Sequence, residues 1–239
     1  MAQRKKMFEA VVHGIFLLLG LITVGCVLLI TVYLIISGIP AIQKIGLVPF
    51  LTGKVWSSTS AEPKYGILPF ILTSVYGTAG AIVLGVPVGF LTAVYLSKVA
   101  PKKVRTVLEA AVSLLAGIPS VVYGFFGMMV LVPLLRQIPH CKGNVMLTAC
   151  ILLGIMILPT VIGTTETALR SVPAMYHEGA LALGATKERS VFTVIVPAAK
   201  SGVLTGIVLG IGRAIGETMA VIMVAGNQTK MPESLFKGV

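Results

Sequence analysis

Two opposite charges lie four residues apart in the segment GRAIGETMAV, which runs from Gly212 to Val221. Arg213 and Glu217 stand within an otherwise apolar stretch, about Val203 to Ala225, that is long enough to cross a membrane. A charge at the centre of a bilayer costs roughly 2.5–3.5 kcal/mol on insertion scales. At 1.5 Å per residue, Arg213 lies about 15 Å beyond Val203, so its charge needs a partner or a wet cavity.

The i, i+4 spacing predicts that Arg213 and Glu217 share one helix face and pair. In one interpretation this pair only fixes helix packing. In the other, Arg213 lines an anion pathway, because its planar fork matches phosphate oxygens. Glu217 then holds the guanidinium when the pathway is empty, and an anion that separates the pair makes occupancy a switch. A row of small residues lets a partner helix approach closely: Gly202, Gly206, Gly210, Ala214 and Thr218.

The composition is that of a membrane protein. Of 239 residues, 56% are hydrophobic and 11% are charged, whereas soluble domains carry roughly 25% charge. The net charge of +11 does not indicate nucleic-acid binding, because the basic residues fall mostly in short segments between apolar runs. The cysteines and histidines show no metal spacing, and neither a nucleophile elbow nor the phosphate loop G-x-x-x-x-G-K-[ST] is present. We therefore expect no catalytic residue, no metal site and no cofactor bound by this chain.

Long runs of apolar residues predict five membrane helices, each above the roughly 20 residues that a crossing needs. They are Gly14–Gln43, Tyr65–Ser97, Ala110–Leu135, Gly143–Thr165 and Val203–Ala225. The first is too long for a signal peptide and is interpreted as a retained anchor. Residues 1–64 are expected to form this anchor and an external segment, and residues 65–239 the helical core. Lysines and arginines favour a cytoplasmic N-terminus.

The inner segment at residues 166–202 has helical signals of its own. Pro173–Leu183 predicts a short helix, and Gly184 is a natural C-terminal stop. Thr186 is then expected to cap a second helix that runs into Pro197. Small residues at this bend would let another protein surface approach closely, although a plain amphipathic connector is the simpler interpretation.

Glu166 stands at the inner end of the fourth predicted helix, beside Thr164 and Thr165. One interpretation places its carboxylate at the inner mouth of a pathway. The simpler one is a helix-end carboxylate that pairs with Arg170, four residues further along.

The stretch EGALALGATKERSVFTVIVP resembles the signature of ABC importer permeases. That signature is E-A-A, a glycine four residues after the second alanine, nine residues, and then I-x-L-P. The spacing matches throughout, and the positions that carry it are Glu178, Gly179, Ala180, Gly184, Val194, Val196 and Pro197. The chain departs from the pattern at Gly179, where the family has alanine, and at the two valines.

Further stretches resemble the phosphate-specific (Pst) permeases, most closely the PstC-like subunit, over about Phe50 to Asn227. They are EPKYGILPFI, GVPVGFLTAVYL, AGIPSVVYGFFG, ALRSVP and GRAIGETMAV. The resemblance implies an all-α polytopic membrane protein with the transmembrane domain of a type I ABC importer. Family members continue into a sixth helix, so we expect five helices of six and a C-terminally incomplete chain.

The resemblance also implies a function, a permease that translocates inorganic phosphate across the cell membrane. The inner loop is then a coupling helix that docks on a cytoplasmic ATPase, with interface residues Glu178, Gly179, Ala180, Gly184, Ala185 and Thr186. Arg213 and Glu217 act in translocation, and we add Thr218 and Glu166 as pathway candidates. The implied partners are a second permease subunit, two ATPase copies that bind ATP, an external phosphate-binding protein and membrane lipid, with no nucleic acid.

Two alternatives stay open at this point. The same elements would serve an importer of another oxyanion, such as sulfate or molybdate. The chain would also suit a membrane scaffold that recruits a phosphate-sensing complex without carrying flux. Mutation of Arg213 separates transport from scaffolding, because only transport needs it.

Overall fold

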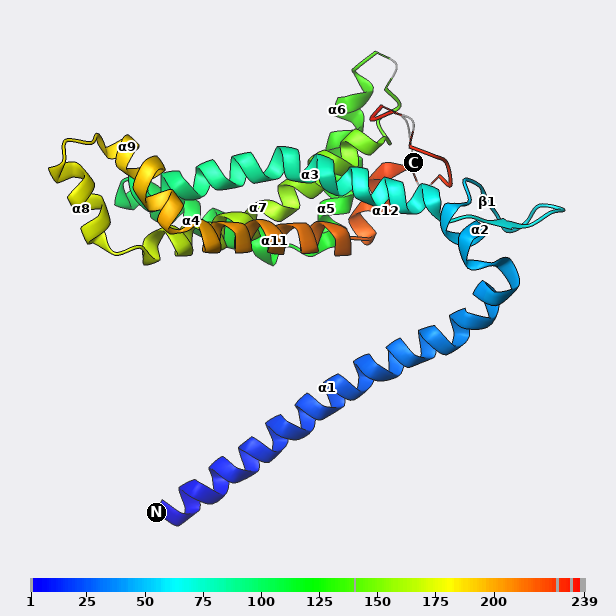
Figure 1. The fold of residues 1–239 in the computed structure, drawn as a ribbon, viewed down its shortest axis with the longest axis horizontal. Helices are drawn as coiled ribbons and strands as arrows, with labels where there is room; N and C mark the ends of the chain where they lie inside the picture. The colour runs from blue at the N-terminus through cyan, green and yellow to red at the C-terminus, as the bar shows by residue number, and fades with distance from the viewer. Residues whose placement is uncertain (1, 140, 227, 233, 237–239) are drawn as a thin grey trace. The chain divides into compact units, whose positions relative to one another are not determined.

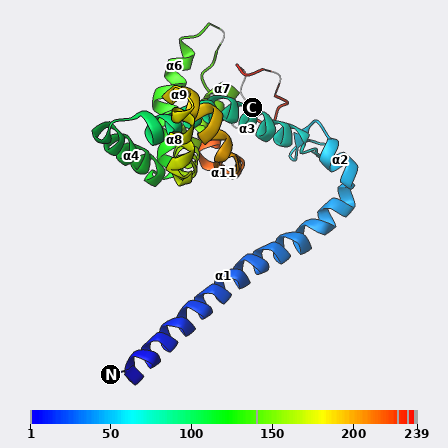
Figure 2. The ribbon, with the colours of Figure 1, turned by 60° about the vertical axis from the view of Figure 1, so that its left-hand side comes forward.

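The computed structural model describes residues 2–139, 141–226, 228–232 and 234–236. The chain divides into two compact units, Met1–Ile67 and Leu68–Val239, and Figures 1 and 2 show the elements of each. Three helical stretches are long and apolar enough to cross a membrane, namely Glu9–Ile45, Leu68–Val99 and Met146–Ser171. Within the described residues the number rises to as many as five if each of two bent helix pairs is one span.

The first unit consists of a long apolar helix followed by a small region of loops, one short helix and two short strands. Helix α1 (Ala2–Ile45) is followed by the short helix α2 (Leu47–Thr52) and by two strands, β1 (Trp56–Ser57) and β2 (Lys64–Tyr65). The strands pair antiparallel, with Trp56 opposite Tyr65. Most described side chains of α1 are exposed, as expected for a helix whose surroundings are lipid or other chains.

The second unit is a helical bundle in which several helices are interrupted. Its first half holds α3 (Leu68–Val94), the π-helical turn η1 (Tyr95–Val99), α4 (Lys102–Gly117), α5 (Ser120–Phe126), the π-helical turn η2 (Gly127–Leu131) and α6 (Val132–Arg136). Its second half holds α7 (Met146–Ser171), α8 (Ala174–Ala182), α9 (Lys187–Ser190), the π-helical turn η3 (Val191–Ile195), α10 (Val196–Ala198), α11 (Lys200–Gly216) and α12 (Met219–Ala225).

Helix α7 is the centre of this bundle. Many of its apolar side chains are almost fully buried, among them Leu152, Met156, Ile157 and Leu169, and α3 and α11 make its most extensive contacts. In Figure 1, α8 and α9 project from one end of the bundle, whereas α5, α6 and α12 lie at the other. The bundle therefore has two different ends, one with a helical elbow and one with short helices.

The third predicted span, Ala110–Leu135, is not one straight helix. The stretch is split into two helical parts, α4 and the segment Ser120–Arg136 that contains α5 and α6. The two parts meet at an angle of 100°. The break lies at Ile118, whose backbone is extended (φ −73°, ψ 126°) and which precedes Pro119. A proline ring clashes with a helical residue before it, so the preceding residue takes the extended form. The Tyr123 hydroxyl donates to the Leu115 carbonyl across the break at 2.9 Å.

The small-residue row of α11 packs against α7 inside the chain. A Cβ atom at Gly210 would lie 2.9 Å from a methyl group of Val161, and one at Gly206 would lie 3.0 Å from the Thr165 hydroxyl. The close helix approach that this row predicts is thus present, and its partner is α7. The same packing fixes the position of the last turn of α11, which carries Arg213.

Candidate functional site

The fifth predicted helix is interrupted at the charged pair itself. Helix α11 ends at Gly216, Glu217 has an extended backbone (φ −80°, ψ 118°), and α12 begins at Met219. The expectation of one continuous helix over Val203–Ala225 is therefore wrong. Two glycines in the last turn of α11, Gly212 and Gly216, weaken the helix just before the break.

Arg213 and Glu217 consequently do not pair. No ion pair joins them among the described residues, because the i, i+4 relation holds only within a continuous helix. The half-buried Arg213 instead points to α7, where its Nη1 donates to the Thr160 hydroxyl at 3.5 Å. This long hydrogen bond leaves most of the donor capacity of the guanidinium available.

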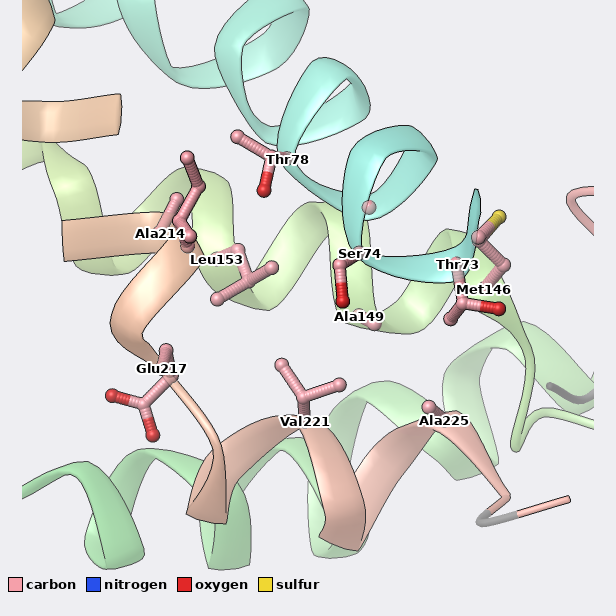
Figure 3. A pocket seen from close by; sticks show the side chains of 12 residues that line it. Thr73, Ser74, Thr78, Met146, Ala149, Leu153, Ala214, Glu217, Val221 and Ala225 are labelled. Carbon is pink, nitrogen blue, oxygen red and sulfur yellow. The ribbon is translucent and has the colours of Figure 1, made fainter. Parts of the chain in front are cut away.

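The Glu217 carboxylate stabilises the start of α12. Its Oε1 accepts the Ala220 backbone N–H at 3.0 Å, one of the helix-start donors that have no partner within the helix. Figure 3 shows the carboxylate turned away from the hydroxyl groups of α3. The glutamate that sequence spacing assigned to Arg213 is thus held by the backbone on the other side of the break.

Two cavities that share several lining residues lie beside this break. The smaller, of about 60 Å³, is lined by the α3 hydroxyl groups of Thr73, Ser74 and Thr78 together with Glu217 (Figure 3). The larger, of about 290 Å³, shares Thr73, Ser74 and Glu217 and adds Thr218. Three elements far apart in sequence, α3, α7 and the α11–α12 junction, therefore enclose a space with both hydroxyl and carboxylate groups.

Glu166 lies in a separate group of charges near the elbow end of α7. Its side chain is 11% exposed, and its Oε1 is 2.5 Å from Nη2 of Arg170. The same nitrogen of Arg170 contacts Glu109 of α4, and Arg105 lies 3.8 Å from Glu109. Glu166 thus has the Arg170 partner that its spacing predicts, within a cluster that joins α4 to α7.

The inner elbow has the expected local structure. Helix α8 ends in a Schellman motif, because Gly184 (φ 86°) donates to Leu181 and Ala185 donates to Ala180. The Thr186 hydroxyl accepts the Arg189 backbone N–H at 3.3 Å and so caps α9. Both the glycine stop and the threonine cap are therefore confirmed.

The surface of the elbow is exposed, and one hydrogen bond joins its two helices. No residue of α8 is buried, Leu183 is 91% exposed, and a Cβ atom at Gly179 would meet nothing within 4 Å. His177 of α8 lies 2.8 Å from the buried hydroxyl of Ser190 at the end of α9. A helix with so little contact to its own chain is available to a partner.

Some residues at the α11–α12 junction and in the charge cluster at Arg170 are not indicated by any pattern in the sequence. Thr160, Glu109 and the α3 hydroxyls join them only through helix packing, so no local pattern indicates them. One signal was available for the break, because Gly216 directly precedes Glu217 and glycine weakens helix interiors.

Comparison with known proteins identifies the family. Residues 85–236 match the family model described as the inner membrane component of binding-protein-dependent transport systems. The chain belongs to this family. As an inner membrane component it is a transport subunit, not a catalytic one, and a multi-pass membrane protein. The all-α fold class expected from the sequence is confirmed.

Relatives that are similar over most of the chain are named permease proteins. A probable ABC transporter permease protein, YqgH of Bacillus subtilis, is 40% identical over 220 residues, which is 91% of this chain and 71% of that protein. The phosphate transport system permease protein PstC of Haemophilus influenzae is 34% identical over 247 residues, 93% of this chain and 75% of the relative. The probable PstC of Methanocaldococcus jannaschii is 32% identical over 219 residues, 84% of this chain and 69% of the relative. The resemblance to PstC-like permeases is confirmed.

Proposed function

We propose that this chain is the permease subunit of an ATP-driven importer that moves inorganic phosphate across the cell membrane. The observation that carries the proposal is the similarity to PstC permeases from a bacterium and an archaeon over most of the chain. A permease for sulfate or molybdate, and a scaffold that carries no flux, are the alternatives. The relatives favour neither.

The phosphate pathway is proposed to pass the α11–α12 junction. Arg213 supplies a partly buried cation with unused donors just before the break. The α3 hydroxyls and Thr218 supply neutral hydrogen-bonding groups in the cavities at the break. Glu217 shapes the site by holding the start of α12, and it bounds the cavity with a negative charge. The arginine needs no release from an ion pair before it meets an anion, so the expected switch by separation of Arg213 and Glu217 has no basis in this fold.

Glu166 is proposed to act at the inner end of that pathway through its ion pair with Arg170. Four residues beyond Arg170 the chain enters α8. A displacement of the elbow would therefore reach Glu166 through one turn of helix, which is a short and direct mechanical connection.

The exposed elbow is proposed to dock on a cytoplasmic ATPase. Its contact residues are Glu178, Gly179, Ala180, Gly184, Ala185 and Thr186, of which only Ala180 and Ala185 are even half-buried. ATP is bound and hydrolysed on that partner, present in two copies. A second permease subunit, an external phosphate-binding protein and membrane lipid complete the assembly. The N-terminus and the elbow then lie on the same, cytoplasmic side, because four proposed spans, an even number, separate them.

The deciding experiment is radiolabelled phosphate uptake in cells that lack their own high-affinity system. The protein is expressed with its partners as wild type, as Arg213→Ala and as the control Arg136→Ala, which removes the exposed arginine that ends α6. We expect uptake by wild type and control and none by Arg213→Ala, with equal assembly of the ATPase. Uptake of sulfate or molybdate but not phosphate would assign the transporter to those anions. Equal phosphate uptake by wild type and Arg213→Ala would contradict the proposed pathway.

A further inference from the structure

Three lysines surround one cavity in the first unit, close to the end of α1. The cavity has a volume of about 640 Å³, and Lys44, Lys54 and Lys64 line it together with Tyr65 and Pro49. The lysines come from three elements: the last turn of α1, the segment after α2, and strand β2. Chain folding, not sequence adjacency, therefore brings the three ammonium groups to one opening.

The walls of this cavity are held by close backbone contact. A Cβ atom at Gly53 would lie 2.6 Å from the Cα atom of Gly66, so both positions need glycine. Gly66 donates to the Val55 carbonyl at 3.0 Å, and Ile67 donates to the Phe50 carbonyl at 2.9 Å. These contacts fasten the segment of Lys54 to the segment of Lys64.

An aromatic pair fixes the register of the same walls. Trp56 and Tyr65 face each other across the two strands, with ring centroids 5.7 Å apart in an edge-to-face arrangement. Lys64 lies opposite Ser57 in the same register. The backbone that presents Lys54 and Lys64 is thus braced on both sides, and the cavity is a formed feature of the loop.

The charge around the cavity is not balanced by the chain. None of its lining residues is acidic, and none of the three lysines forms an ion pair in the described part of the protein. Like charges around one space repel each other, and an anion in that space relieves the repulsion. Membrane topology does not account for these lysines, since in the proposed orientation they lie on the outer side, where positive residues are not favoured.

We propose that this cavity binds a phosphate group, either from an anionic phospholipid headgroup or as inorganic phosphate. Lysine is suited to this role, because its ammonium is a compact point charge on a flexible stem. Lys44 ends an exposed apolar helix, so the opening lies where lipid phosphates are found. The site shares no residue with the proposed pathway at Arg213, and it does not depend on the transported anion.

The test uses the assembled transporter, without its external binding protein, in lipid nanodiscs. Binding of phosphatidylglycerol is measured by native mass spectrometry in mixed nanodiscs, and binding of radiolabelled inorganic phosphate in neutral phosphatidylcholine nanodiscs. The variant K44Q/K54Q/K64Q removes the three charges. The variant K102Q/K103Q/K142Q removes three exposed lysines elsewhere, and K44R/K54R/K64R keeps the cavity charges and shows that the loop tolerates substitution. All are also made with Arg213→Ala, which excludes phosphate held in the pathway.

We expect K44Q/K54Q/K64Q to weaken one of the two probes on the order of a hundredfold, from roughly a factor of five for each lysine near an anionic surface. The other two variants should stay within about threefold of wild type. Loss of phosphatidylglycerol assigns the site to lipid, and loss of inorganic phosphate assigns it to the free anion. Equal binding of both probes by K44Q/K54Q/K64Q and by the lysine control would overturn the proposal.

Discussion

At the scale of single residues, the α11–α12 junction shows two opposite charges that sequence spacing pairs and the fold separates. Arg213 contacts Thr160 on α7, whereas Glu217 accepts the Ala220 backbone N–H. The physical cause is the extended backbone at Glu217, which ends the helical periodicity that the i, i+4 rule assumes. Each charge therefore has its own contact: Arg213 with a helix that lines a cavity, and Glu217 with the start of α12.

Substitution of Glu217 separates its charge from its hydrogen bond. In Glu217→Gln the side-chain amide oxygen still accepts from Ala220, so we expect unchanged thermal unfolding in detergent. Glu217→Ala loses that bond and about 1 kcal/mol of stability. If the carboxylate also sets the charge of the pathway, phosphate uptake falls about tenfold in both variants. Full uptake by Glu217→Gln would show that the residue acts only as a helix cap.

At the scale of helices, the cluster at Arg170 joins α4 to α7 just before the elbow. One guanidinium nitrogen contacts both Glu109 and Glu166. The two carboxylates differ in exposure, because the Glu109 side chain is 36% exposed and that of Glu166 only 11%. Removal of Arg170, which leaves the buried Glu166 carboxylate without its cation, and removal of the exposed Glu109 should therefore have unequal effects on stability.

Removal of Arg170 should cost more stability than removal of Glu109. Arg170→Gln leaves the buried Glu166 carboxylate without its cation, which we expect to cost about 1–3 kcal/mol after allowance for the exposure of the guanidinium. Glu109→Gln removes a more exposed partner, whose ion pair is screened by solvent, and should cost clearly less stability. Thermal unfolding of the assembled transporter measures both, and Lys102→Gln serves as a control for a charge lost from α4. Equal losses from Arg170→Gln and Glu109→Gln would contradict this assignment.

Two glycines of α11 provide a matched test of the α7–α11 contact. In Gly210→Ala the new methyl group would lie 2.9 Å from Val161, so the helices must separate. In Gly212→Ala nothing lies within 4 Å of the new atom. We expect a loss of about 1–3 kcal/mol for the first and no loss for the second, where alanine also has the higher helix propensity by about 1 kcal/mol. Detergent-resistant assembly and thermal unfolding measure the difference, and a destabilised Gly212→Ala would refute the assigned face.

The helices differ in how far the sequence predicts them. The elbow at Gly184 and Thr186 was predictable, because a glycine stop and a threonine cap act within one turn of backbone. The sequence predicts one span over Ala110–Leu135 and does not give the bend at Pro119, because the size of such a bend depends on where α5 packs. The cavity hydroxyls of α3 and the contact of Glu109 with Arg170 were not predictable, because they depend on packing between segments distant in the chain.

At the scale of the whole molecule, the elbow helix α8 is the part with the least support from its own chain. Its residues are not buried, and at its end Leu183 is 91% exposed. Exposed apolar side chains on a well-formed helix are typical of a surface that another protein covers. The fold of the chain and its assembly with partners can therefore be separated by substitutions on α8.

Substitutions at Gly179 should best distinguish folding of the chain from its assembly with the ATPase. The family pattern has alanine there, and a Cβ atom would meet nothing within 4 Å, so Gly179→Ala should leave folding and phosphate uptake unchanged. Gly179 is exposed, so the large side chain of Gly179→Trp would instead fill the space that a docked ATPase needs. We expect the tryptophan variant to reach the membrane with normal thermal unfolding, to lose co-purification of the ATPase by more than tenfold, and to lose uptake. A tryptophan variant that retains the ATPase would place the docking surface elsewhere on the chain, and loss of folding in the alanine variant would show that α8 is not free in the isolated subunit.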